Sequence, residues 1–189
     1  MLMRRRGHAG MTLVEVVVGL VIMALLGAVI IPQVTQRLRD GQAAAIANNI
    51  SSIRIAVTEF RKSVGRYPSQ LAQLSTQPSA GAADLCGRVV PTDWATVWRG
   101  PYVAQVVGAS GIAVRDAIVL NQIRRNPATL PGGTLAELLI DVINVDQAVA
   151  GVIERSLDSS FDLNAGTIRW VATGGDQGTL TLSMPVRGC

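Results

Sequence analysis

Hydrophobic side chains are concentrated in one stretch near the start of the chain. Residues 11–31 read MTLVEVVVGLVIMALLGAVII, and Glu15 is the only charged residue among them. A helix of this length would measure about 31 Å, close to the thickness of the hydrocarbon core of a bilayer. The pattern therefore predicts a membrane-spanning helix. Glu15 is unexpected in such a helix, because a carboxylate buried near the bilayer centre costs about 3 kcal/mol, so it is a candidate functional residue.

A second helical pattern follows Pro32. Proline lacks the backbone N–H and predicts either a kink in a continuing helix or the end of the helix at the membrane surface. Apolar residues then recur every three or four positions up to Gly65, at Ile46, Ile50, Ile53, Val57, Phe60 and Val64. This spacing predicts an amphipathic helix that packs on the protein's own C-terminal domain.

The remainder of the chain has mixed character. Segments with β character are expected at residues 102–107, 112–120, 135–145, 167–173 and 179–184, the last two joined by a glycine-rich turn. Short helices are expected at residues 69–74 and 146–157, and loops at 75–93 and 126–133. Trp94 and Trp98 are expected to cover a small core. The predicted fold class is α+β, with a long N-terminal helix packed on a head that contains a mainly antiparallel sheet.

The charge of the chain is concentrated in its first ten residues. The formal net charge is +4, with 17 basic and 13 acidic side chains. Three of the basic residues are Arg4, Arg5 and Arg6, so 17 − 3 = 14 remain against 13 acidic residues beyond this segment. His8, the only histidine, lies in the same segment. Without it the chain has no Ser-His or Cys-His pair and no histidine-ligated zinc, and we do not expect an enzyme. A membrane-tethered enzyme would need a catalytic cluster, and no paired-carboxylate motif is apparent.

Three ordinary kinds of N-terminus fit this segment incompletely. A secretory signal peptide has a shorter apolar region followed by a small-residue cleavage site, which is missing after Ile31. A twin-arginine signal is suggested by Arg4–Arg6, but so apolar a segment favours insertion into the bilayer. An uncleaved signal anchor explains the arginines through the positive-inside rule. It does not explain Glu15.

The residues Gly10-Met11-Thr12-Leu13-Val14-Glu15 resemble the processing site of type IV pilins and type II secretion pseudopilins. The resemblance implies that prepilin peptidase cuts between Gly10 and Met11 and that the new N-terminal Met11 is methylated. It also implies that Glu15 pairs with the Met11 amine of its own or a neighbouring subunit. The family usually has Phe at the first mature position, so Met11 is a departure.

The resemblance also implies a domain organisation and partners. A leader (1–10) precedes a transmembrane and assembly helix (11–31), a periplasmic amphipathic half (32–66) and a periplasmic α+β head (67–189). The protein would cross the inner membrane once, with its N-terminus cytoplasmic, and would later enter the helical filament of a pilus or pseudopilus as a minor or specialised subunit. Expected partners are prepilin peptidase, other pilin or pseudopilin subunits, an inner-membrane assembly platform and the lipid bilayer. The alternatives are a non-polymerising single-pass periplasmic binding or scaffold protein, and a minor pilin involved in DNA uptake.

Three further groups of residues carry weaker expectations. Cys86 and Cys189 are far apart and form no CxxC motif, and on the far side of a membrane they would form one disulfide. Asp158 and Asp162 could ligate calcium, although their spacing does not match an EF-hand loop and favours a polar turn. We therefore expect no cofactor, with calcium as the alternative. Arg124 and Arg125 are too few to supply much affinity for nucleic acid, which is not an expected partner.

Overall fold

The computed structural model describes residues 11–89, 93–126, 129–130, 133–134, 136–158 and 166–186. The chain divides into two compact units, residues 1–39 and 40–189. Helix α1 (Leu13–Val64) contributes to both units. The later part of α1 therefore belongs to the same unit as the sheet, and the sequence analysis predicted that this part packs on the C-terminal domain.

Helix α1 runs through Pro32 without a break. A helix that ends at the membrane surface is therefore wrong for this chain, and the continuing helix is the alternative that holds. The missing N–H of Pro32 leaves the carbonyl of Ala28 without its usual helical donor. The helix ends at Val64, and Gly65 follows with a positive φ of 74°, as the stop signal in the sequence predicted.

The second unit is built on an antiparallel five-stranded sheet with the order β1-β2-β5-β7-β6. The strands are β1 (Gly111–Val114), β2 (Ala117–Asn126), β5 (Ala136–Asp146), β6 (Ile168–Gly174) and β7 (Gln177–Val186). A separate small hairpin is formed by β3 (Thr129–Leu130) and β4 (Gly133–Thr134). The remaining helices are α2 (Ala72–Ser75), α3 (Trp94–Val97) and α4 (Gln147–Leu157). The α+β class predicted from the sequence is confirmed.

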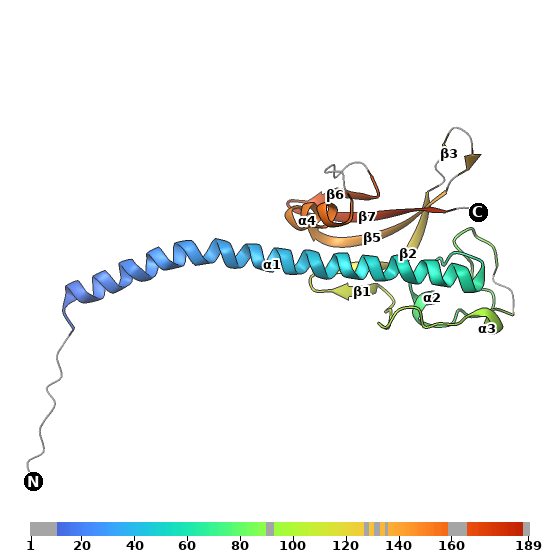
Figure 1. The fold of residues 1–189 in the computed structure, drawn as a ribbon, viewed down its shortest axis with the longest axis horizontal. Helices are drawn as coiled ribbons and strands as arrows, with labels where there is room; N and C mark the ends of the chain where they lie inside the picture. The colour runs from blue at the N-terminus through green and yellow to red at the C-terminus, as the bar shows by residue number, and fades with distance from the viewer. Residues whose placement is uncertain are drawn as a thin grey trace, which may run out of the picture. The chain divides into compact units, whose positions relative to one another are not determined.

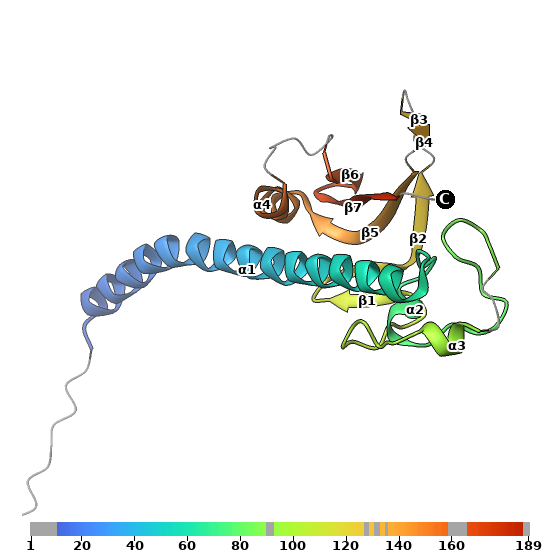
Figure 2. The same ribbon diagram turned by 45° about the vertical axis from the view of Figure 1, so that its right-hand side comes forward.

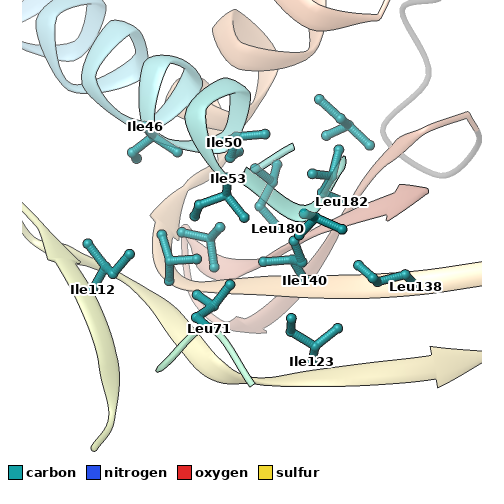
Figure 3. Close-up of a cluster of buried hydrophobic side chains, with 14 of the residues drawn as sticks. Ile46, Ile50, Ile53, Leu71, Ile112, Ile123, Leu138, Ile140, Leu180 and Leu182 are labelled. Carbon is teal, nitrogen blue, oxygen red and sulfur yellow. The ribbon is translucent and has the colours of Figure 1, made fainter. Parts of the chain in front are cut away.

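The core lies between the later part of α1 and one face of the sheet (Figures 1 and 2). Figure 3 shows Ile46, Ile50 and Ile53 of α1 pointing toward Ile140 and Leu182 of the sheet. The predicted apolar stripe of α1 is fully buried from Ile46 to Phe60, and Val64 packs at its edge. The helical period thus places one face of α1 in the core and leaves the other face to solvent.

Strand register explains which side chains reach this core. Ile140 of β5 is opposite Ile123 of β2 on one side and Leu182 of β7 on the other. All three are buried. Because side chains alternate along a strand, Asp141 points to the opposite face of the sheet. Thr181 of β7 is opposite Asp141 in the register and lies on the same face.

Two elements close the sheet as the sequence predicted. Helix α4 begins after Asp146, whose carboxylate accepts the backbone N–H of Ala148 at 2.8 Å and so caps the helix. Strands β6 and β7 form the expected hairpin, with a tight turn at Gly175–Asp176. The indole N–H of Trp170 in β6 donates to the carbonyl of Val145, which ties the hairpin to β5.

Two strand predictions are wrong. Residues 102–107 form no strand, because the backbone N–H of Tyr102 donates to the carbonyl of Leu74 at the end of α2 rather than to a sheet ladder. Residues 112–120 form a hairpin instead of one strand, with Arg115 in a left-handed conformation (φ 55°) between β1 and β2. The sequence hides this turn, since Arg115-Asp116 lacks the glycine that usually marks a two-residue hairpin.

The tryptophans cover the core as predicted. Trp94 is buried, and its ring meets Phe60 of α1 edge to face at 5.5 Å between centroids. Tyr102 contacts both Phe60 and Trp98 in the same manner. The indole N–H of Trp98 donates to the carbonyl of Gln73. The four rings therefore close the end of the core near the last turn of α1, and no ligand platform is needed to explain them.

Candidate membrane and assembly interface

The first unit consists of the early part of α1, and its side chains are exposed. Every described residue of this unit other than its glycines is exposed, and the large apolar side chains are distributed around the whole helix. Among the described residues, α1 is the one helix that is long and apolar enough to cross a membrane. A helix that is apolar all round is stable only where lipid or other apolar helices surround it. We call residues 11–31 the apolar segment.

Thr12 caps this helix. Its hydroxyl oxygen accepts the backbone N–H of Glu15 at 3.3 Å, and its carbonyl accepts the N–H of Val16 at 3.3 Å. Because Leu13 is the first helical residue, Thr12 occupies the N-cap position and Glu15 the third position of the helix. This arrangement matches the first half of a capping box. The role of Thr12 was missed from the sequence, although the Thr-x-x-Glu pattern was there to signal it.

Glu15 lies in the first turn of α1, where its negative charge interacts favourably with the positive end of the helix dipole. Met11 precedes the cap, lies outside the helix and is 79% exposed. In a capping box the side chain at the third position reaches back toward the N-terminus, and that direction leads to Met11. The cleavage, the methylation and the pairing with an amine stay predictions, and Gly10 lies outside the described residues.

Cys86 lies in a loop organised by a buried carboxylate that the sequence did not single out. Asp84 accepts the backbone N–H groups of Cys86 and Arg88 at 2.9 and 2.8 Å, and the side chain of Arg88 at 2.9 Å. Arg66 adds a second cation at 3.5 Å. No cysteine of the described chain is a free thiol. Cys189 lies outside the described residues, so its pairing with Cys86 stays a prediction.

Arg124 is held by an acidic neighbour on the sheet. Its guanidinium donates two hydrogen bonds to the carboxylate of Asp141, at 2.5 and 2.7 Å. These bonds raise the pKa of Arg124 above its ordinary value, against a smaller opposing effect of burial. Thr181 also donates to Asp141 at 2.8 Å. A guanidinium engaged in this way has less capacity to bind a phosphate, which argues against Arg124 as a contact to DNA.

Of the two candidate calcium ligands, Asp158 lies within the described residues. The carboxylate of Asp158 accepts the N–H and the hydroxyl of Thr167 at 2.8 and 2.9 Å, as expected of a polar turn. Asp162 lies outside the described residues. In the part of the chain that is described, no group of three His, Cys, Asp or Glu residues could hold a metal ion. Calcium binding stays a hypothesis.

Comparison with known proteins identifies the N-terminal segment. Residues 5–31 match the family model described as the prokaryotic N-terminal methylation motif. The toxin coregulated pilin of Vibrio cholerae is 31% identical over 83 residues, which cover 43% of this chain and 37% of the pilin. Type II secretion system core protein G of Pseudomonas aeruginosa is 28% identical over 118 residues, which cover 58% of this chain and 81% of that protein. The alignment thus spans little more than a third of the pilin, and no solved structure matches.

Proposed function

We infer that the chain, which carries the N-terminal methylation motif and has a pilin and a type II secretion pseudopilin as homologues, is a structural subunit of a type IV pilus or a type II secretion pseudopilus. One observation carries this inference. The methylation motif ends in a helix whose apolar side chains are exposed on all sides. Such a helix needs an apolar environment, and a bilayer and a filament core would supply one before and after assembly.

Processing would convert the leader into a free amine at the start of the apolar segment. In this proposal prepilin peptidase cuts between Gly10 and Met11, and Met11 is then methylated. The cut also removes Arg4–Arg6, which would hold the N-terminus on the cytoplasmic side of the inner membrane while the head lies in the periplasm. Extraction of the segment from the bilayer then no longer requires three arginines to cross it.

Glu15 would serve as the partner of that amine. Each charge is costly alone in apolar surroundings and tolerable when it is paired. The N-cap bond from Glu15 to Thr12 supports the proposal, because it fixes the turn that carries the carboxylate next to the amine. In a filament the same carboxylate can pair with the amine of a neighbouring subunit, and this pairing would set the register between subunits.

The protein would act through assembly rather than catalysis. Its partners in this proposal are prepilin peptidase, other pilin or pseudopilin subunits, an inner-membrane assembly platform and the lipid bilayer. No cofactor is required for such a role. The homologues are a pilin and a type II secretion system core protein, and the described sheet and core would supply a stable head for such a subunit.

The processing step can be tested directly. The full chain is produced in membranes with and without an active prepilin peptidase, and its N-terminal mass is measured. We expect a chain that begins at methylated Met11. Gly10→Val should abolish the cut, whereas the matched change Gly7→Val should leave it intact. An uncut wild-type chain, or a cut at another site, would contradict the proposal and favour a non-polymerising anchored scaffold.

Assembly is tested separately. We expect the processed chain to enter a sheared filament fraction with other pilin or pseudopilin subunits, and to do so only when the peptidase is active. A processed chain that stays wholly in the membrane under conditions in which its partner subunits form filaments would contradict the assembly role while leaving the processing role intact.

A further inference from the structure

The first charges after Glu15 are a pair of arginines. Residues 16–36 carry no charged side chain, and Arg37 and Arg39 then follow within α1. Both arginines are exposed. Neither makes an ion pair or a side-chain hydrogen bond within the described chain. Two guanidinium groups that have no protein partner are therefore placed just beyond the apolar segment.

Helix geometry places this pair at the surface of a bilayer that the apolar segment would span. The rise from Ile31 is roughly 9 Å to Arg37 and roughly 12 Å to Arg39. The polar headgroup layer adds roughly 5–8 Å on each side of the hydrocarbon core. Side chains of a helix tilt toward its N-terminus, which here means back toward the bilayer. Both guanidinium groups can thus reach the headgroup layer without any change in the backbone.

The two arginines also have the chemistry and spacing of an anchor. A guanidinium presents paired N–H donors that match the oxygens of a phosphate. Residues 37 and 39 are about 200° apart around the helix, so the two side chains leave it on opposite sides. Residues 11–45 contain no Trp or Tyr, which are the other usual anchors at a membrane surface. Asp40 follows directly, so two arginines and one acid leave a net positive charge, and through this charge the end of the segment would recognise the interface.

We propose that Arg37 and Arg39 bind the phosphate groups of phospholipids at the far face of the bilayer and fix the depth of the membrane segment. This proposal rests on the proposed function, because it requires residues 11–31 to span a bilayer. Removal of the leader would leave the arginine pair as the main electrostatic anchor of the segment. When the chain leaves the bilayer for a filament, Arg37 and Arg39 would have to exchange their lipid contacts for other partners. The Met11 end of the segment would carry no arginine and would have no such contacts to exchange.

The test measures contact between arginine and lipid phosphorus. The full chain, labelled with carbon-13 at its arginine guanidinium carbons, is reconstituted into vesicles of phosphatidylethanolamine and phosphatidylglycerol in phosphate-free buffer. Carbon–phosphorus dipolar dephasing is recorded by solid-state NMR. We compare the wild type with Arg37→Gln/Arg39→Gln and with the matched control Arg54→Gln/Arg99→Gln, which removes two exposed arginines of the second unit. The leader arginines are the same in all three chains.

We expect dephasing of part of the arginine signal in the wild type, a smaller dephased fraction in Arg37→Gln/Arg39→Gln, in which only the leader arginines still contact phosphate, and no loss in the control. Unchanged dephasing in Arg37→Gln/Arg39→Gln would overturn the proposal, as would an equal loss in both variants. Extraction with alkaline carbonate separates this result from the underlying function. A chain released from the vesicles contradicts the membrane anchor itself, whereas a chain that is retained with unchanged dephasing contradicts only the role of the arginines.

Discussion

The hydroxyl oxygen of Thr12 accepts the backbone N–H of Glu15 at 3.3 Å and thereby fixes the first turn of α1. An N-cap bond of this kind stabilises a helix end by about 1 kcal/mol. The residue that carries the candidate assembly charge is therefore held by the residue that starts the helix. This relationship makes Thr12 a positioning residue for the proposed amine–carboxylate pair.

The first prediction concerns Thr12 itself. Thr12→Val keeps the β-branched shape and removes the hydroxyl, so the first turn should fray. We expect faster amide hydrogen exchange at Glu15 and Val16 in the reconstituted chain and less incorporation into filaments, with the cut after Gly10 retained. Thr12→Ser, which keeps a hydroxyl, should behave like the wild type. Equal exchange rates in all three chains would show that the cap contributes nothing.

The second prediction separates the charge of Glu15 from its shape. Glu15→Gln leaves the backbone cap to Thr12 and removes the negative charge, so the Met11 amine loses its partner. The variant should be cut and anchored normally but should enter filaments poorly. Glu59→Gln changes an exposed carboxylate elsewhere on α1 and serves as the control. Normal assembly of Glu15→Gln would contradict the amine–carboxylate pair.

The third prediction tests the packing of α1 on the sheet. Ile50 is fully buried, whereas Ile55 on the same helix is 65% exposed. Ile50→Ala should lower the free energy of unfolding by about 2–5 kcal/mol, because it removes buried methyl groups and leaves a cavity. Ile55→Ala should change the free energy by less than about 0.5 kcal/mol. Urea unfolding of the chain in detergent, followed by tryptophan fluorescence, compares the two, and equal effects would contradict the packing.

The fourth prediction is an asymmetry between Arg124 and Asp141. Only 7% of the Asp141 side chain is exposed, against 54% for Arg124. Arg124→Ala removes the charged partner of a buried carboxylate and should lower the free energy of unfolding by about 1–3 kcal/mol. Asp141→Ala leaves a guanidinium that can turn into solvent, so its cost should be smaller. The same unfolding measurement decides the order of the two variants, and a larger cost for Asp141→Ala would contradict the assignment.

The pKa of Arg124 gives that pair a pH dependence with a definite sign. Because its pKa is raised in the folded state, the stabilisation by the charged guanidinium is complete below the ordinary pKa of an arginine and is lost only at more alkaline pH. The contribution of Arg124 to the free energy of unfolding should therefore stay constant between about pH 5 and pH 9, where an arginine is fully charged. A difference between wild type and Arg124→Gln that falls between pH 7 and pH 9 would contradict this.

The fifth prediction concerns the proposed Cys86–Cys189 disulfide. It would close a loop of roughly 100 residues and contribute about 4–5 kcal/mol in the chain-entropy model. Reducing agent should therefore lower the melting temperature of the wild type markedly and leave that of Cys86→Ser unchanged. Mass spectrometry with thiol alkylation checks the pairing. Two free thiols in protein from an oxidising compartment would contradict it.

Asp84 allows the backbone conformation of the Cys86 loop to be tested separately from the disulfide. Its carboxylate holds the backbone around Cys86 without involving sulfur. Asp84→Asn should keep both thiols able to pair but should slow their oxidation after reduction, since the loop is no longer fixed by the two arginines. Asp93→Asn, an exposed acidic residue near the same region, should oxidise at the wild-type rate.

The elements that could be predicted from the sequence are those with a local, repeated signal. The apolar segment, the stripe from Ile46 to Phe60 and helix α4 each depend on residues close together in the chain. The β6–β7 hairpin was equally visible, because its turn is rich in glycine. The β1–β2 turn was missed, since Arg115 adopts a positive φ without any glycine to mark it.

The apolar segment, its single acid Glu15 and the glycine before the predicted cut could be recognised from the sequence alone, because these residues lie close together in the chain. The Thr12 cap depends on the same stretch, but it was recognised only in the structure. Tertiary structure decided the rest. It brought Asp141 beside Arg124 and Arg66 beside Asp84, and it left residues 102–107 without a strand partner. These outcomes depend on strand register and on contacts between distant residues. A local pattern carries no information about them, because the partners meet only after the chain has folded.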